Sequence, residues 1–227
     1  MLNRLANVLS LLVLLSIKAP AQPRFTDPDS HSPDRAQVAF SKDAARKFVD
    51  DFARCVASRQ PGRAAAVLNL PYGSEQQAKA VGDLAAREYD CLGPFSGNLE
   101  IGFGAEPIAS GMAEYFLGNL GKIAELRRRD PRSFAYREPI GIEAFGECVV
   151  AQKPDAVEAL ATSKIASPAE SVATDALAPE LQQCVWAGQT VALDRTSLRQ
   201  VLTVSLYRHV AMPGDPRLTA TQTSSPR

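Results

Sequence analysis

Four cysteines are the residues of this chain whose type could give a cross-link, a metal site or a reactive thiol: Cys55, Cys91, Cys148 and Cys184. Cys55 and Cys91 lie 36 positions apart, and so do Cys148 and Cys184. A redox pair or a zinc site needs cysteine or histidine residues in short clusters, so this wide spacing favours neither. We predict that all four cysteines form disulfides, for which three pairings are possible.

Few other residues suggest catalysis. His31 lies in a polar stretch and His209 at the end of the last predicted helix, and no sequence pattern places a nucleophile or an orienting group beside either. Glu143 and Glu147 lie four positions apart, on a helix whose apolar face already explains its pattern. We therefore predict no catalytic, cofactor-binding or metal-binding residue, and keep an enzyme with an unpatterned site as the alternative.

The charge composition indicates no charged class of partner. Lys+Arg and Asp+Glu both number 25, which excludes an overall electrostatic attraction to nucleic acid or to an anionic membrane. The basic stretch Arg127–Arg129 suits the C-terminus of a helix, where cations are favoured. Gly102-x-Gly104 has no strand and helix context that would indicate a phosphate-binding loop.

An internal repeat organises the chain. The segment from Phe52 to Cys91 matches the segment from Phe145 to Cys184 at a shift of 93 positions, and all four cysteines coincide. Only the pairing Cys55–Cys91 and Cys148–Cys184 is the same in both copies, so we predict these two disulfides. The repeat also predicts two packed helical units, with a pseudo-twofold axis between them and any ligand in the groove that they share, near the segments after Cys91 and Cys184.

Helix signals fill the first copy. Ser41 is a good N-cap for an amphipathic helix that carries Cys55 on its apolar stripe. A short helix is expected over residues 63–70, and the capping box that begins at Ser74 predicts a third helix that reaches Tyr89. Further helices are expected over residues 107–117 and 120–127.

The second copy repeats these signals. Helices are expected around Phe145, over residues 155–161, and from the capping box at Ser167 to Gln183, with a kink or an early stop at Pro179. Residues 197–209 form a last amphipathic helix, which ends beside Arg208. Alternating residues predict short β segments after Cys91 and Cys184, at 99–103 and 190–193.

The N-terminus has the pattern of a secretory signal peptide. A short basic start precedes an apolar run over residues 5–17, and small residues follow at 19–21, so we expect cleavage after Ala21. Export to an oxidising compartment agrees with disulfide formation. The expected organisation is a signal peptide (1–21), a flexible lead-in (22–40), two helical repeats (41–136 and 137–212) and a mobile tail (213–227).

The sequence thus predicts a mainly α fold of two tandem disulfide-stapled helical repeats. The functional hypothesis is an exported binding or structural module, in the bacterial periplasm or outside the cell, for an unknown small ligand or protein partner. No cofactor, nucleic acid or membrane partner after cleavage is expected. The alternative is a secreted hydrolase-like enzyme with its site in the groove between the repeats.

Overall fold

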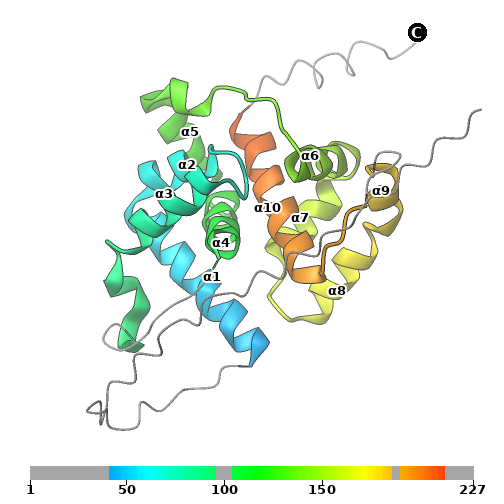
Figure 1. The fold of residues 1–227 in the computed structure, drawn as a ribbon, viewed down its shortest axis with the longest axis horizontal. Coiled ribbons are helices and arrows are strands. Elements are labelled where there is room, and N and C mark those ends of the chain that lie inside the picture. Colours follow the sequence, from blue (N-terminus) through cyan, green and yellow to red (C-terminus); the bar gives the residue numbers. More distant parts are fainter. Residues whose placement is uncertain (1–40, 96–103, 186–189, 213–227) are drawn as a thin grey trace, which may run out of the picture. The chain divides into compact units, whose positions relative to one another are not determined.

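The computed structural model describes residues 41–95, 104–185 and 190–212, and in this part of the chain the regular structure is helical, with no strand. The N-terminal helices, shown in Figure 1, are α1 (Lys42–Arg59), α2 (Pro61–Leu68), α3 (Glu75–Ala85), the 3-10 helix η1 (Tyr89–Phe95), α4 (Ala105–Leu117), α5 (Leu120–Arg129) and the 3-10 helix η2 (Pro131–Phe134). The C-terminal helices are α6 (Ile142–Gln152), α7 (Pro154–Thr162), α8 (Pro168–Asp175), α9 (Ala178–Gln183) and α10 (Arg195–Ala211).

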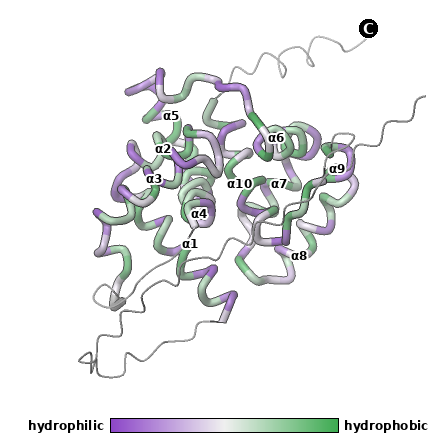
Figure 2. The backbone as a smooth tube through the Cα atoms, viewed as in Figure 1, coloured by the Kyte–Doolittle hydropathy of each residue, from purple (hydrophilic) through white to green (hydrophobic). Residues whose placement is uncertain are grey.

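The predicted helix starts agree with the structure. Ser41 Oγ accepts a hydrogen bond from the N–H of Ala44 at 3.2 Å, and Ser74 and Ser167 cap α3 and α8 in the same way. Each cap satisfies one of the backbone donors that the first turn of a helix leaves free. Along α1, hydrophilic residues are interspersed with the hydrophobic ones that face the core (Figure 2).

Two predicted helices are shorter than the sequence suggested. The helix expected to reach Tyr89 ends at Ala85. Beyond it the buried Glu88 pairs with Arg59 of α1 and accepts a hydrogen bond from Gln60, the C-cap of α1. The helix expected to reach Gln183 is divided into α8 and α9, and Pro179 lies in the first turn of α9, so the interruption predicted at this proline is confirmed. Proline lacks the N–H that a continuous helix would need and is tolerated only in a first turn.

The predicted β segment at 190–193 was wrong. These residues are not a strand; Val191 and Leu193 instead pack against the core of the C-terminal helices. A strand needs a partner for its backbone groups, and no partner strand exists among the described residues. The other β segment, at 99–103, lies outside the described residues, as do the predicted signal peptide, lead-in and tail.

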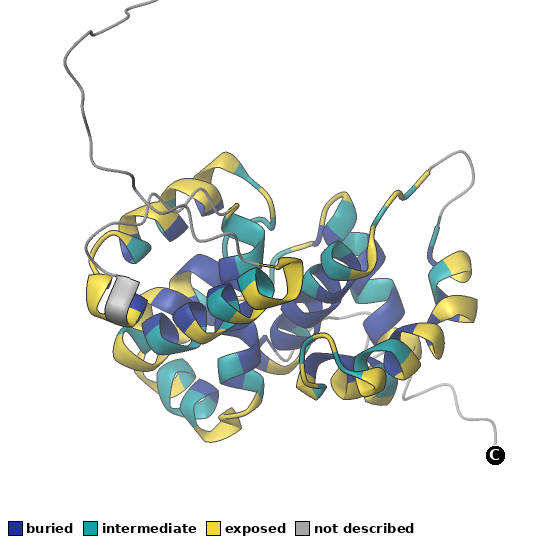
Figure 3. Cartoon of the chain, turned by 90° about the horizontal axis from the view of Figure 1, so that it is seen from below, coloured by how far each residue is buried: buried dark blue, intermediate teal, exposed yellow. Residues whose placement is uncertain are grey.

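The last helix, α10, is central rather than amphipathic. Leu198, Val201, Leu202 and Leu206 belong to the core of the C-terminal helices, whereas Val204 and Tyr207 belong to that of the N-terminal helices. It packs against α4, α6 and α7 (Figure 1), and Figure 3 shows that buried residues gather in the interior between the helices. One helix thereby joins the two hydrophobic cores.

Disulfides join Cys55 to Cys91 and Cys148 to Cys184, the pairing that the repeat predicts. The first ties α1 to η1, and the second ties α6 to the residue that follows α9. Cys184 is buried, whereas the other three are partly buried. Each bridge thus ties the first helix of its group to the chain 36 positions later.

Candidate functional site

A buried ionic cluster lies where α1, α4 and α10 meet. Glu114 of α4 accepts hydrogen bonds from Arg199 of α10, at 2.9 Å, and from Arg54 of α1. Arg54 also pairs with Asp50, one turn earlier on α1, at 2.8 Å. We call Asp50, Arg54, Glu114 and Arg199 the Glu114 cluster. It connects two N-terminal helices to the C-terminal helix α10.

Arg199 is saturated by the groups around it. Besides Glu114, its guanidinium donates to the backbone oxygens of Leu160, Ala161 and Ser163 at 2.8 to 3.1 Å. These oxygens lie at the C-terminal end of α7, where a helix leaves its last carbonyls without partners. The side chain is 4% exposed. Arg199 therefore closes α7 and holds the Glu114 carboxylate in place.

Burial raises the pKa of Glu114 to about 7. The charge of Arg199 acts against this shift, the neighbouring Asp50 carboxylate adds to it, and Arg54 acts against it again. Two carboxylates that share a buried site repel each other when both are ionised, which favours the protonated form of one. Glu114 is thus a carboxyl group that changes charge near neutral pH.

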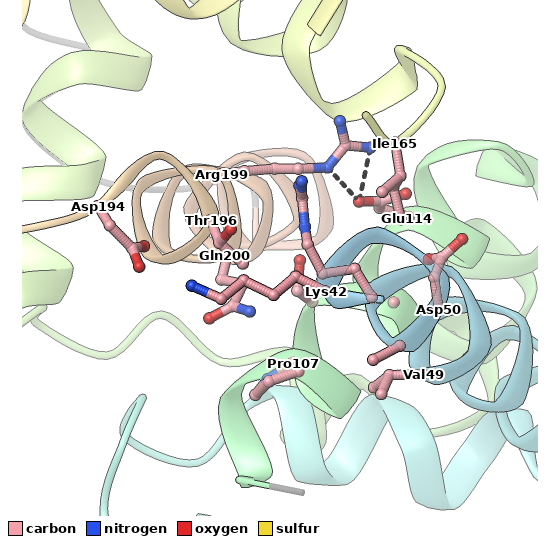
Figure 4. A pocket seen from close by; sticks show the side chains of 14 residues that line it. Lys42, Val49, Asp50, Pro107, Glu114, Ile165, Asp194, Thr196, Arg199 and Gln200 are labelled. Atoms are coloured by element: carbon pink, nitrogen blue, oxygen red, sulfur yellow. Dashed lines mark hydrogen bonds and ion pairs between the residues drawn. The ribbon is translucent and has the colours of Figure 1, made fainter. Parts of the chain in front are cut away.

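A pocket of about 390 Å³ opens beside this cluster, between α1, α4, α10 and the loop that joins α7 to α8 (Figure 4). We call it the seam pocket, because the N-terminal and C-terminal helices both line it. Its apolar lining comes from Ala45, Val49, Pro107, Gly111 and Ile165. Asp50, Glu114 and Arg199 form its charged wall.

The close packing of α1 on α4 shapes one side of the pocket. A Cβ atom on Gly111 would lie 2.7 Å from the Cβ of Ala53 and 3.2 Å from Oδ1 of Asp50. Only glycine lets the two helices approach this closely. Asp50 Oδ1 is sealed by this contact and has no hydrogen-bond partner among the described residues.

Four other polar side chains line the seam pocket without a hydrogen bond or ion pair to any described residue: Lys42, Ser110, Thr196 and Gln200. They come from α1, α4 and α10. Ser110 is only 4% exposed, and buried hydroxyl groups are normally hydrogen-bonded. The pocket therefore combines apolar walls with a few polar side chains that are able to hydrogen-bond a ligand.

A second buried cluster lies on the far part of α10. Glu143 of α6 accepts hydrogen bonds from Arg208, from Arg137 at 2.6 Å and from the N–H of Tyr72 at 2.6 Å. We call Glu143, Arg137 and Arg208 the Glu143 cluster. Burial acts to raise the pKa of Glu143, but the hydrogen bonds from Arg137 and Tyr72 and the arginine charges outweigh it, and the net shift is downward.

The sequence analysis missed both clusters. It interpreted Glu143 as part of a helix explained by its apolar face and Arg208 as a cation at a helix end, yet both are 3% exposed and paired with each other. Glu114 and Arg199 received no role at all. Their partners lie 60 to 85 positions away in the chain, so no local pattern could have revealed them. His209 is half-buried and lies outside the residues that line the seam pocket.

No model of a protein family matches the chain, and no similar protein was found among the curated proteins or the solved structures. In the described part of the chain, no helix has the length and apolar character needed to cross a membrane. Among the same residues, no group of three or more acidic, cysteine or histidine side chains is arranged to hold a metal ion. The site's geometry is therefore the basis for the functional proposal.

Proposed function

We propose that this protein is an exported helical binding module and that its ligand site is the seam pocket. The observation that carries the proposal is the convergence, in one pocket with apolar walls, of polar side chains from three helices that have no hydrogen bond or ion pair to a described residue. Small-molecule sites are concave and mostly apolar, with a few placed polar groups that fix the orientation of the ligand. Beside these groups, the ion pairs of the Glu114 cluster hold α1, α4 and α10 together.

Export is supported by two independent features. The first 21 residues have the order of a signal peptide, and two disulfides are compatible with an oxidising compartment. We further propose that the two groups of helices descend from one duplicated unit. In support, α2 and α7 begin at prolines 93 positions apart, as do the serine caps of α3 and α8.

A fragment screen tests the binding proposal. Protein expressed from the full-length gene is screened against a small-molecule fragment library by saturation-transfer NMR, together with the variants Ala45→Trp and Ala44→Trp. Ala45 lines the seam pocket, whereas its neighbour Ala44 is exposed on α1 and does not. We expect fragments that bind the wild type and Ala44→Trp but not Ala45→Trp. Equal binding to both variants, or no binding fragment, would contradict the proposal.

A hydrolase-like enzyme is the second candidate, and Glu114 is the observation that favours it. A carboxyl group with a pKa of about 7 has the acidity expected of a general acid or base at neutral pH. Both of its oxygens, however, are held by arginines, and its side chain is 3% exposed. This arrangement suits a structural ion pair better than proton transfer to a ligand.

Turnover assays separate the two candidates. The protein is incubated with p-nitrophenyl acetate and p-nitrophenyl phosphate, and release of p-nitrophenol is measured. We expect no release that depends on the pocket. Hydrolysis that is lost in both Glu114→Gln and Ala45→Trp, but kept in Ala44→Trp, would favour the enzyme.

A further inference from the structure

We propose that the seam pocket binds a small zwitterion, either a free amino acid or a short peptide with both termini free. This inference rests on the proposed function, because it names the ligand class of the same pocket. It is carried by charges of opposite sign at the rim of the pocket that do not pair with each other.

Lys42 supplies the positive charge of the rim. It is the first residue of α1, it is exposed, and it has no ion pair among the described residues. Arg46, one turn later, cannot play this part, since Glu170 holds it at 2.5 Å and Asp43 lies 3.8 Å from it. A ligand carboxylate at Lys42 would therefore meet the one lining cation that no described residue neutralises.

Asp194 supplies the negative charge. It is the N-cap of α10, and its Oδ1 accepts a hydrogen bond from the N–H of Ser197 at 2.7 Å. This bond lowers the pKa of Asp194 and keeps the carboxylate ionised. Asp194 is exposed, and a carboxylate has about four sites that can accept hydrogen bonds, so it can still accept one from an ammonium group.

The two charges come from different parts of the fold, and they are too far apart to form an ion pair. Lys42 belongs to α1 and Asp194 to α10, and Thr196 and Gln200 lie with them around the pocket (Figure 4). A molecule with one charge of each sign would satisfy both. A pure anion or a pure cation would leave one rim charge without a partner.

The rest of the pocket suits the uncharged parts of such a ligand. Val49, Pro107 and Ile165 offer apolar contacts for an aliphatic side chain. Ser110 and Gln200 offer a hydroxyl and an amide, which can bond a peptide group or a carboxylate. The carboxylates of the charged wall are already paired, Asp50 with Arg54 and Glu114 with Arg54 and Arg199.

Isothermal titration with three related probes tests the inference. Leucyl-leucine has both charges, N-acetyl-leucyl-leucine has only the carboxylate, and leucyl-leucine methyl ester has only the ammonium group. We expect leucyl-leucine to bind at least about fivefold more tightly than either analogue, since charge-assisted hydrogen bonds are stronger than neutral ones. Maltose, a neutral polyhydroxy probe of similar size, is expected not to bind.

Two variants assign the charges. Lys42→Gln should weaken leucyl-leucine binding about fivefold and leave the methyl ester unchanged. Asp194→Asn should weaken leucyl-leucine by a similar factor and leave the N-acetyl compound unchanged; asparagine preserves the helix cap. Lys47→Gln is the matched control, because Lys47 is exposed on α1 and does not line this pocket.

Equal affinities for all three peptides, tighter binding of maltose, or selectivity that survives both variants would overturn the zwitterion inference. If leucyl-leucine does not bind while fragments sensitive to Ala45→Trp do, the inference fails and the proposed function stands. If no fragment is sensitive to Ala45→Trp, the proposed function fails first.

Discussion

The Glu114 and Glu143 clusters are built from the same parts but behave differently. Each places a buried glutamate of one helix against an arginine of α10, with a second arginine beside it. Yet burial raises the pKa of Glu114 to about 7, whereas the pKa of Glu143 is lowered. The difference lies in the other neighbours of the two carboxylates.

Glu143 accepts hydrogen bonds from backbone N–H groups, whereas Glu114 lies beside a second carboxylate. The N–H groups of Tyr72 and Ile140 both donate to Glu143, and hydrogen bonds to a carboxylate favour its charged form. Asp50, by contrast, adds negative charge beside Glu114. The Glu143 cluster is therefore a fixed ionic joint. In the Glu114 cluster, which forms a wall of the seam pocket, the glutamate changes charge near neutral pH.

A large effect is expected from the loss of the anion of the fixed joint. Glu143→Gln removes the carboxylate that pairs directly with the buried Arg208, leaves only the more distant charge of Glu147, and should lower the free energy of unfolding by about 3 kcal/mol at pH 7. Glu114→Gln should cost only about 1 kcal/mol, since Glu114 is about half protonated at that pH. Urea unfolding followed by circular dichroism measures both. Glu158→Gln, at an exposed position of α7, should leave stability unchanged, and equal losses in the two cluster variants would remove the distinction.

The two disulfides allow the helix groups themselves to be compared. Both bridges span 36 positions, so the loop-closure model predicts the same stabilisation for each, at most about 4 kcal/mol. The double variants Cys55→Ser/Cys91→Ser and Cys148→Ser/Cys184→Ser are compared by thermal unfolding. Losses that differ strongly would show that local packing, such as the burial of Cys184, outweighs loop closure.

The pH dependence of stability should separate the two glutamates. In the folded protein the pKa of Glu114, about 7, lies above its ordinary value of 4.5. The contribution of Glu114 to the free energy of unfolding is therefore greatest below pH 4.5 and is lost as the pH rises through 7. The loss is at most about 3.5 kcal/mol, because each pKa unit between 4.5 and about 7 corresponds to about 1.4 kcal/mol. Glu143, whose pKa is lowered, stabilises the fold above pH 4.5 and loses this contribution in acid.

Unfolding of Glu114→Gln and Glu143→Gln across pH 3–8 checks these signs. The fall in stability between pH 5 and 7.5 should disappear in Glu114→Gln, and part of the acid loss should disappear in Glu143→Gln. A wild type whose stability rises steadily from pH 5 to 7.5, with no change in the Glu114→Gln profile, would refute the proposed difference.

The smallest effects concern the glycines that bring helices together near each cluster. A Cβ on Gly146 would lie 2.2 Å from Ser205 Oγ, so Gly146→Ala should separate α6 from α10 and cost about 1–2 kcal/mol. Gly111→Ala, against Ala53, should cost a similar amount. Gly121→Ala is the control, since nothing lies within 4 Å of its Cβ position and alanine favours a helix. Stability that matches the wild type in all three would show that neither contact is tight.

Local signals predicted much of the helical fold. Ser41, Ser74 and Ser167 marked helix starts, and the repeated cysteines indicated the disulfides because cysteine chemistry depends on few other residues. The expected groove and the seam pocket both lie between N-terminal and C-terminal helices, but none of the described residues directly after Cys91, where the groove was expected, lines the pocket.

The polar interior could not be predicted in this way. A charged residue in a helix normally indicates the solvent face, so the amphipathic pattern of residues 197–209 gave no sign that Arg199 and Arg208 are buried. Both are buried because α10 is covered on all sides by α4, α6 and α7. Burial of this kind depends on which helices pack together, and that information is not local to the segment.

Amide mapping tests the central claim of a ligand site at the seam most directly. The ¹H–¹⁵N spectrum of the full-length protein is followed during titration with each fragment whose binding is lost in Ala45→Trp. The account predicts concerted shifts at Ala45, Ser110 and Thr196, which lie on three different helices and line the same pocket. Shifts confined to one of these helices, or centred on residues outside the pocket, would contradict it.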